Sequence, residues 1–292
     1  MSMSKYSYIN LLFLVFSIIA CGQSGKKGKP KEVLRTLPLY DLNNPQVYKL
    51  PKVLNEISGI SFLNGDKTTI YAEQDEDGKL FYFHLGSNDI QETKFGRKGD
   101  YEDVQLCNGY VLMLRSDGVL FTFSIKDINN KEVKNVQEFN NLLPNGEYEG
   151  LYADNASNKL YVLCKHCNEK LTKTNSGYIF SLAGNGDIKL EGSFEIDVEK
   201  IAAKAGVKKL AFEPSALAKN LQTNEWYIVS SVNKLLVVTN SDWTIKEVYP
   251  LDAALYNQPE GIAFDKENNL YISNEKGNTG SATVLKIVYQ EP

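Results

Sequence analysis

Short apolar segments alternate with polar turns along most of the chain, and they fall into groups of four. The first group covers residues 57–62, 69–72, 80–85 and 90–95, and turns such as Asp75-Glu76-Asp77-Gly78 separate its members. Short runs rich in β-branched and aromatic residues, bounded by turn residues, predict β-strands. Four strands in about 40 residues are typical of one blade of a β-propeller.

A short motif with a glutamate or serine at its centre opens each group, and its clearest copy is Gln258-Pro259-Glu260-Gly261-Ile262. The central residues of the five copies are Ser58, Glu102, Glu149, Ser215 and Glu260, which gives steps of 44, 47, 66 and 45 residues. Self-similarity at this period is typical of a radial β-repeat. The long step contains a loop expected at residues 168–176 and a helix expected at 198–205, ended by Gly206.

The remaining groups follow the same pattern but the last one is incomplete. Their expected strands are 104–106, 110–114, 119–125 and 133–139; 151–153, 160–164, 178–182 and 188–194; 216–218, 226–230, 235–238 and 245–249; and 262–264, 270–273 and 284–288. Residues 47–50 or 33–40 can supply the missing outer strand and cover the exposed sheet edge. We therefore predict an all-β fold, a five-bladed β-propeller of four-stranded antiparallel blades, with the ring closed by an N-terminal strand.

The N-terminal residues predict export. Lys5 precedes an apolar run at 11–20 that is too short for a stable membrane span, and the run ends in Ile18-Ile19-Ala20-Cys21. This ending resembles the lipobox of bacterial lipoproteins, which implies cleavage before Cys21 and lipidation of that residue. The alternative is an ordinary secretory signal. The predicted organisation is a lipoprotein signal peptide at 1–20, a flexible Lys-rich tether at 21–32 and a propeller domain at 33–292.

The predicted location is the bacterial cell envelope, where lipidated Cys21 would hold the protein on a membrane, facing the periplasm or the cell surface. Of the 32 basic and 36 acidic residues, five lysines and one glutamate precede residue 33, so the folded body carries a net charge of −8. Dispersed basic residues on an acidic body argue against nucleic acid as a partner. The tether's lysines would favour an anionic membrane surface, although a soluble linker is the simpler interpretation. We expect a monomer.

The repeated motif also places acids on one face of each first strand. Residues two apart in a strand face the same side, so a second series lies two positions before the first: Glu56, Asp100, Glu147, Glu213 and Gln258. The first strand of a blade is the one nearest the propeller axis, which predicts two rings of oxygen ligands there. Crowded carboxylates raise one another's pKa, and Ca²⁺, which takes six to eight oxygens, would relieve the repulsion.

The predicted cofactor is therefore Ca²⁺ on the axis. Its predicted ligands are Glu56, Glu102, Glu149, Glu213 and Glu260. In the alternative interpretation, each acid caps a strand or accepts hydrogen bonds from backbone N–H groups of a neighbouring blade, with no metal.

Cys164-Lys165-His166-Cys167 has the spacing of half a zinc site or of a redox pair. A zinc ribbon needs a second Cys-x-x-Cys, which the sequence lacks, and no thioredoxin-like pattern surrounds this one. In an oxidising compartment, a local disulfide between Cys164 and Cys167 is the favoured interpretation. An unpaired structural dithiol and redox catalysis are the alternatives.

Several of these segments together resemble the SdiA-regulated (YjiK-like) family of bacterial envelope proteins, over nearly all of residues 45–290. The segments that carry the resemblance are Glu56-Ile-Ser-Gly-Ile, Tyr148-Glu149-Gly150-Leu151, Pro214-Ser215-Ala216-Leu217 with Leu235-Leu236-Val237, and Pro259-Glu260-Gly261-Ile262-Ala263 with Asn269-Leu270-Tyr271-Ile272-Ser273. The resemblance implies a five-bladed β-propeller with a calcium site, distantly similar to NHL-repeat propellers, and no established biochemical activity. The second unit has Glu102-Asp103 where the family pattern has Glu-Gly.

Two functions fit these features. The first is a lipid-anchored binding or interaction protein whose axial calcium is structural and whose loops meet an unidentified protein or small-molecule ligand. The second is a calcium-dependent hydrolase, similar to phytase or lactonase propellers, in which the metal activates water or a phosphate. The second rests on analogy of fold, and the three arginines, Arg35, Arg97 and Arg115, are few for a phosphate site. We expect a binding protein rather than an enzyme.

Overall fold

The computed structural model describes residues 37–167, 173–278 and 280–291. The predicted signal peptide, Cys21 and the tether lie outside the described residues. Contacts within the chain separate residues 1–33 from residues 34–292, and every described residue belongs to the second unit.

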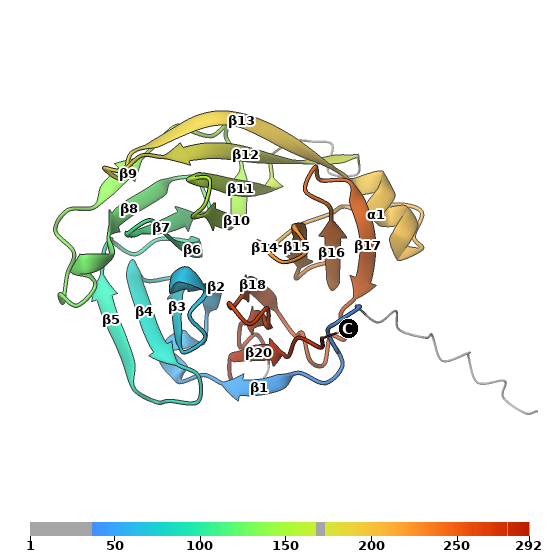
Figure 1. Ribbon diagram of the computed structural model, residues 1–292, viewed down its shortest axis with the longest axis horizontal. Coiled ribbons are helices and arrows are strands. Elements are labelled where there is room, and N and C mark those ends of the chain that lie inside the picture. Colours follow the sequence, from blue (N-terminus) through green and yellow to red (C-terminus); the bar gives the residue numbers. More distant parts are fainter. Residues whose placement is uncertain (1–36, 168–172, 279, 292) are drawn as a thin grey trace, which may run out of the picture. The chain divides into compact units, whose positions relative to one another are not determined.

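Five four-stranded antiparallel sheets form this unit, as predicted (Figure 1). Four of them are consecutive in the sequence: β2 (Ile57–Phe62), β3 (Thr69–Gln74), β4 (Lys79–His84) and β5 (Ile90–Lys94); β6 (Tyr101–Cys107), β7 (Tyr110–Arg115), β8 (Leu120–Ser124) and β9 (Gln137–Phe139); β10 (Glu147–Asp154), β11 (Lys159–His166), β12 (Thr174–Leu182) and β13 (Ile188–Asp197); β14 (Ala216–Asn220), β15 (Glu225–Ser230), β16 (Leu235–Thr239) and β17 (Ile245–Pro250). Short 3-10 turns lie at Lys52–Leu54, Leu63–Gly65 and Ile125–Asp127.

The fifth blade joins the two ends of the domain. β18 (Pro259–Phe264), β19 (Leu270–Asn274) and β20 (Thr283–Ile287) are completed by β1 (Gln46–Lys49), which pairs antiparallel with β20. The prediction that an N-terminal strand closes the ring is therefore confirmed, and residues 46–49 supply it. The first strands of successive blades contact one another in cyclic order, β2 with β6, β6 with β10, β10 with β14, β14 with β18 and β18 with β2.

In the described part of the chain, the hydrophobic core consists of five clusters, and each lies between two neighbouring blades. One example packs Ile57 and Phe81 of the first blade against Tyr271 and Val284 of the fifth. Because alternate residues of a strand face opposite sides, each blade presents apolar side chains to both neighbours. Burial between blades thus holds the ring together without a single central core.

The third blade carries the additions that lengthen its repeat. Helix α1 (Val198–Ala205) follows β13; the Asp197 side chain accepts a hydrogen bond from Lys200 N at its start, and Gly206, with φ 75°, ends it. A left-handed residue after the last turn is a common helix end, and glycine adopts that conformation without strain. The helix prediction is confirmed. The loop expected at 168–176 is partly wrong, because β12 begins at Thr174, while residues 168–172 lie outside the described part of the chain.

Candidate metal centre

A β-bulge sits at the repeated position of four inner strands. Glu102 of β6 has no pairing partner on β7, because the register shifts between its two neighbours in the strand. The same holds for Glu149 between β10 and β11 and for Glu260 between β18 and β19. In β2, the register shifts between Ile57 and Ile60, across Ser58. An extra, unpaired residue in a strand redirects its side chain. Each of these four residues lines a cavity of about 220 Å³.

This cavity lies at the start of the inner strands and is acidic. Among the described residues, seven carboxylates and one ammonium line it, together with Ser58 and Gln258; the charged residues are Asp75, Asp100, Glu102, Glu147, Glu149, Glu260, Glu275 and Lys165. Members of both predicted rings therefore meet at one end of the inner strands. Glu56 and Glu213 are not among the residues that line the cavity.

Three carboxylates beside this cavity have the spacing of a metal site. Ligand oxygens of Glu56, Asp75 and Glu275 all lie within 4.8 Å of one another. Ca²⁺ at 2.3–2.6 Å from each ligand can join oxygens up to about 5 Å apart. Asp75 Oδ1 is buried and accepts no hydrogen bond. We call Glu56, Asp75 and Glu275 the carboxylate triad.

Pairing between strands explains how the triad forms. Asp75 directly follows β3, and its backbone N donates to Glu56 O at 3.2 Å; Glu275 directly follows β19 and donates to Gln258 O at 3.0 Å. In an antiparallel hairpin, the end of the second strand lies beside the start of the first. Asp75 and Glu275 are therefore functional candidates that the sequence analysis missed. The hairpin pairing of the repeats was the signal that could have identified them.

Burial and like charges raise the pKa of several of these acids. The pKa of Asp75 is raised to about 6 by burial and then by Glu56, and that of Glu275 to about 8 by burial and then by Glu260. Burial, followed by the charge of Glu260, raises the pKa of Glu149 to about 7. The pKa of Glu102 is raised to about 10 by burial and then by Glu149. The site therefore disfavours its own fully ionised form, and a bound cation would remove that penalty.

Lys165 supplies one positive charge from within the chain. Its ammonium binds Glu149 Oε1 and lies 3.5 Å from Glu147 Oε1. Glu149 is 5% exposed, and its second oxygen, Oε2, is buried without a hydrogen-bond partner. Lys165 thus compensates part of the negative charge on the third blade, while the triad lies on the first and fifth blades.

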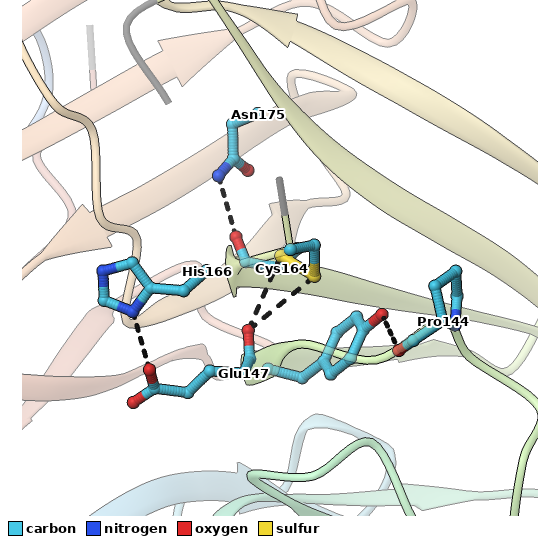
Figure 2. The surroundings of a disulfide bond; sticks show 7 residues. Pro144, Glu147, Cys164, His166 and Asn175 are labelled. Carbon is cyan, nitrogen blue, oxygen red and sulfur yellow. Dashed lines mark hydrogen bonds and ion pairs between the residues drawn. A yellow bond between two sulfur atoms is a disulfide. The ribbon is translucent and has the colours of Figure 1, made fainter. Parts of the chain in front are cut away.

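A disulfide joins the two cysteines on either side of Lys165 and His166, and Figure 2 shows its surroundings. Cys164 and Cys167 are bonded, and both sulfurs lie near Glu147 O, at 3.6 and 3.9 Å. The Asn175 side chain donates to Cys164 O at 2.8 Å. The remaining described cysteine, Cys107, is buried and free. This short loop fixes the end of β11 where Lys165 enters the acidic cavity.

His166 links the predicted metal ligand Glu213 to Glu147, a member of the second predicted ring. Its Nδ1 lies 2.6 Å from Glu147 Oε2, and its Nε2 lies 3.3 Å from Glu213 Oε2. Glu147 belongs to the third blade, whereas Glu213 precedes the first strand of the fourth. The imidazole therefore bridges two blades, and Glu213 faces a histidine in this structure. Its role as a metal ligand stays a prediction.

Two further buried acids, Asp103 and Glu73, accept hydrogen bonds from backbone N–H groups. This is the role that the metal-free interpretation of the sequence gave to the acids of the repeated motif. Asp103 accepts hydrogen bonds from Val104 N and from Leu151 N of the next blade, both at 2.7 Å. Glu73 accepts one from Gly59 N at 2.6 Å. A Cβ at Gly59 would lie 2.3 Å from Asp103 Oδ1, so a glycine there makes room for the carboxylate.

The fold and this site define a five-bladed propeller with an acidic cavity on its axis. The chain belongs to the SdiA-regulated family, because the sequence profile of that family matches residues 36–278. No curated protein sequence matches the chain. Within the described residues, no helix has the length and apolar character needed to cross a membrane.

Solved structures with similar folds come from proteins of varied activity. Glutaminyl cyclase from Myxococcus xanthus is 16% identical with a TM-score of 0.54, over 83% of this chain and 93% of that one. Aldose sugar dehydrogenase from Streptomyces coelicolor, in its PQQ-bound form, is 10% identical with a TM-score of 0.52, over 85% and 99%. The calcium-binding protein regucalcin from Agrobacterium tumefaciens is 13% identical with a TM-score of 0.50, over 88% and 100%. At these identities the similarity shows the fold alone.

Proposed function

We propose that this SdiA-regulated propeller binds Ca²⁺ at the acidic end of its axis and acts as a lipid-anchored binding protein of the bacterial cell envelope. The observation that carries the calcium site is the carboxylate triad, whose oxygens lie within 4.8 Å of one another. All three are hard oxygen ligands, which suit Ca²⁺. In this proposal Glu102, Glu149 and Glu260 supply negative charge and further oxygens beside the triad.

The charge balance of the cavity supports a divalent ion. In the part of the lining that the structure describes, one ammonium faces seven carboxylates, and Glu56 adds an eighth nearby. The pKa values of Asp75, Glu149 and Glu275 lie between about 6 and about 8. At neutral pH these groups therefore remain partly ionised, so two added positive charges would stabilise the folded state.

A structural role for the ion follows from where its ligands originate. Glu56 and Asp75 belong to the first blade and Glu275 to the fifth, so the ion would bridge the first blade to the blade in which β1 and β20 pair. A solved propeller of similar fold, regucalcin, is described as calcium-binding, which supports the proposal without identifying the ligands. The predicted lipidation of Cys21 would hold this domain on a membrane, with its loops free to meet a protein or small-molecule ligand.

Isothermal titration calorimetry tests the calcium site. The protein is purified in detergent, stripped with a chelator and titrated with Ca²⁺. The double variant Asp75→Asn with Glu275→Gln should bind Ca²⁺ at least tenfold more weakly than wild type. The matched control, Glu138→Gln with Glu195→Gln, removes two exposed acids of the outer strands β9 and β13 and should leave the affinity unchanged. Equal Ca²⁺ affinities for both double variants would refute the proposal that the carboxylate triad binds Ca²⁺.

The same samples test the hydrolase alternative. Phosphatase and lactonase substrates are assayed with Ca²⁺ and with chelator. A binding protein with a structural ion gives no calcium-dependent turnover. Turnover that requires Ca²⁺ and is lost in the Asp75→Asn, Glu275→Gln variant would contradict a purely structural ion and would support the hydrolase function instead.

A further inference from the structure

A second and larger cavity, of about 830 Å³, lies at the opposite end of the same inner strands. The residue three positions after each central residue of the repeat lines it: Ser61, Gln105, Tyr152, Ala218 and Ala263. The acidic cavity is lined by the starts of these strands, and this cavity by their ends. We call it the distal cavity. Its volume falls in the range of small-molecule sites, about 300–1,000 Å³.

Small side chains leave this space open. We call the five inner-strand residues that line the cavity its floor, and three of them, Ser61, Ala218 and Ala263, are small. The Ser61 hydroxyl donates a hydrogen bond to Gln105 Oε1 at 3.5 Å. Aromatic rings form much of the wall: Phe62, Tyr152, Phe264 and Tyr289. Leu221 also lines the cavity and is 73% exposed. Flat apolar walls around an open centre suit a planar or compact apolar body.

The charged groups of the wall differ in their partners and in their exposure. The Asp265 carboxylate accepts four hydrogen bonds, from Glu267 N, Asn269 N, Asn269 Nδ2 and Tyr271 Oη, each at 2.9 Å. Glu267 is paired with Lys67. Lys266 and Glu291 are exposed and of opposite sign. Lys219 is partly buried, and among the described residues it forms no ion pair.

Lys219 is held in place by an aromatic ring. Its ammonium lies 5.4 Å from the centre of the Trp226 ring, which limits the loss of side-chain freedom when an anion binds. An ammonium beside apolar walls binds an anionic group more strongly than it would in open water, because the walls exclude solvent. The Lys219 side of the distal cavity is therefore suited to a single negative charge.

We propose that the distal cavity is a binding site for a small monoanion with a flat apolar body, such as an aromatic carboxylate or sulfonate. Lys219 binds the anionic group, and the aromatic wall and small floor residues contact the apolar part. This site is independent of the proposed calcium site, because the two cavities have no described lining residue in common.

Two dyes that differ by one charge test the proposal. The anionic probe is 8-anilinonaphthalene-1-sulfonate, and N-phenyl-1-naphthylamine is the same ring system without the sulfonate. Each is titrated into the folded full-length protein at low salt, and binding is followed by energy transfer from Trp226 and Trp243. We expect saturable binding with one dye per chain, and an affinity for the sulfonate about tenfold above that for the neutral dye, the scale of one charge-assisted contact.

Lys219→Gln should remove this tenfold difference and leave binding of the neutral dye unchanged. Lys189→Gln, which removes an exposed lysine of the outer strand β13, is the control and should preserve the difference. A bulky replacement, Ala218→Phe, should weaken both dyes, but the charge comparison does not depend on whether that variant folds. Absence of saturable binding, equal affinities for the two dyes, or no effect of Lys219→Gln would overturn the proposal.

Discussion

The ammonium of Lys165 binds one oxygen of the Glu149 carboxylate, while the other oxygen of Glu149 is buried without a partner. The chain thus carries a cation inside the cavity that is proposed to hold Ca²⁺. Glu149 lies at the third blade's bulge, and the triad lies on the first and fifth blades. Lys165 and the metal ion would therefore neutralise different sides of one acidic cavity, and each should affect the other through its charge.

Removing Lys165 should destabilise the calcium-free protein and strengthen calcium binding. Lys165→Met leaves Glu149 without its counter-ion, and breaking such a buried pair costs about 3 kcal/mol. It also removes a positive charge that repels Ca²⁺. Chemical denaturation with chelator measures the first effect and calorimetry the second. A variant that is equally stable and binds Ca²⁺ no more tightly would contradict this role for Lys165.

The Cys164–Cys167 disulfide should contribute modestly to stability and more clearly to the position of Lys165. Closing a loop this short stabilises a protein by about 2 kcal/mol in the chain-entropy description. The double variant Cys164→Ser with Cys167→Ser should lose about that amount in denaturant unfolding, and its calcium affinity should shift towards that of Lys165→Met. Reduced wild-type protein should behave as the variant does. A calcium affinity unchanged in both would show that the loop does not position Lys165.

The stability of calcium-free protein should fall as pH rises from about 5 to about 8. The pKa values of Asp75, Glu149 and Glu275 in the folded protein, about 6, 7 and 8, lie above the values near 4 of unfolded chains. Over this interval the folded state binds more protons than the unfolded state, so raising the pH favours unfolding. Melting temperatures measured with chelator should therefore decrease across this interval.

Calcium should reverse this trend. The ion binds ionised carboxylates, so its affinity should rise between about pH 6 and pH 8, and the melting temperature with saturating Ca²⁺ should change little or increase. Parallel pH profiles with and without Ca²⁺ would argue against these three acids as the groups that couple pH to stability.

Asp103 should contribute to the stability of the fold but not to the affinity for Ca²⁺. Asp103→Ala would leave the N–H groups of Val104 and Leu151 without their acceptor, and two unsatisfied buried donors cost about 2–4 kcal/mol together. Asp103→Asn keeps one side-chain oxygen and should lose less. Calorimetry on the folded Ala variant should give the wild-type calcium affinity; a tenfold loss would place Asp103 in the metal site.

The five blades could be predicted because the motif around Glu260 recurs with its strands, and the missing outer strand pointed to residues such as Val47 for ring closure. The site was harder to predict. Two-residue periodicity placed Glu102, Glu149 and Glu260 on the axis but could not reveal the bulges at which they sit. Asp75 and Glu275 reach the cavity through hairpin pairing, a contact between strands.

In the sequence, Lys165 stands out only as part of a cysteine motif. Nothing local to Cys164-Lys165-His166-Cys167 indicates that the end of β11 meets the inner strand of its own blade at Glu147 and Glu149. The sequence shows which charged residues are present, but the pairing of strands in the hairpins determines which of them lie together.

The most direct test of the calcium site is the titration of chelator-treated protein in which only the triad is altered. Wild type and the Glu138→Gln, Glu195→Gln control should bind Ca²⁺ with the same affinity, and Asp75→Asn with Glu275→Gln should bind it at least tenfold more weakly. Unchanged affinity in the triad variant, or no binding of Ca²⁺ by wild type, would contradict the account.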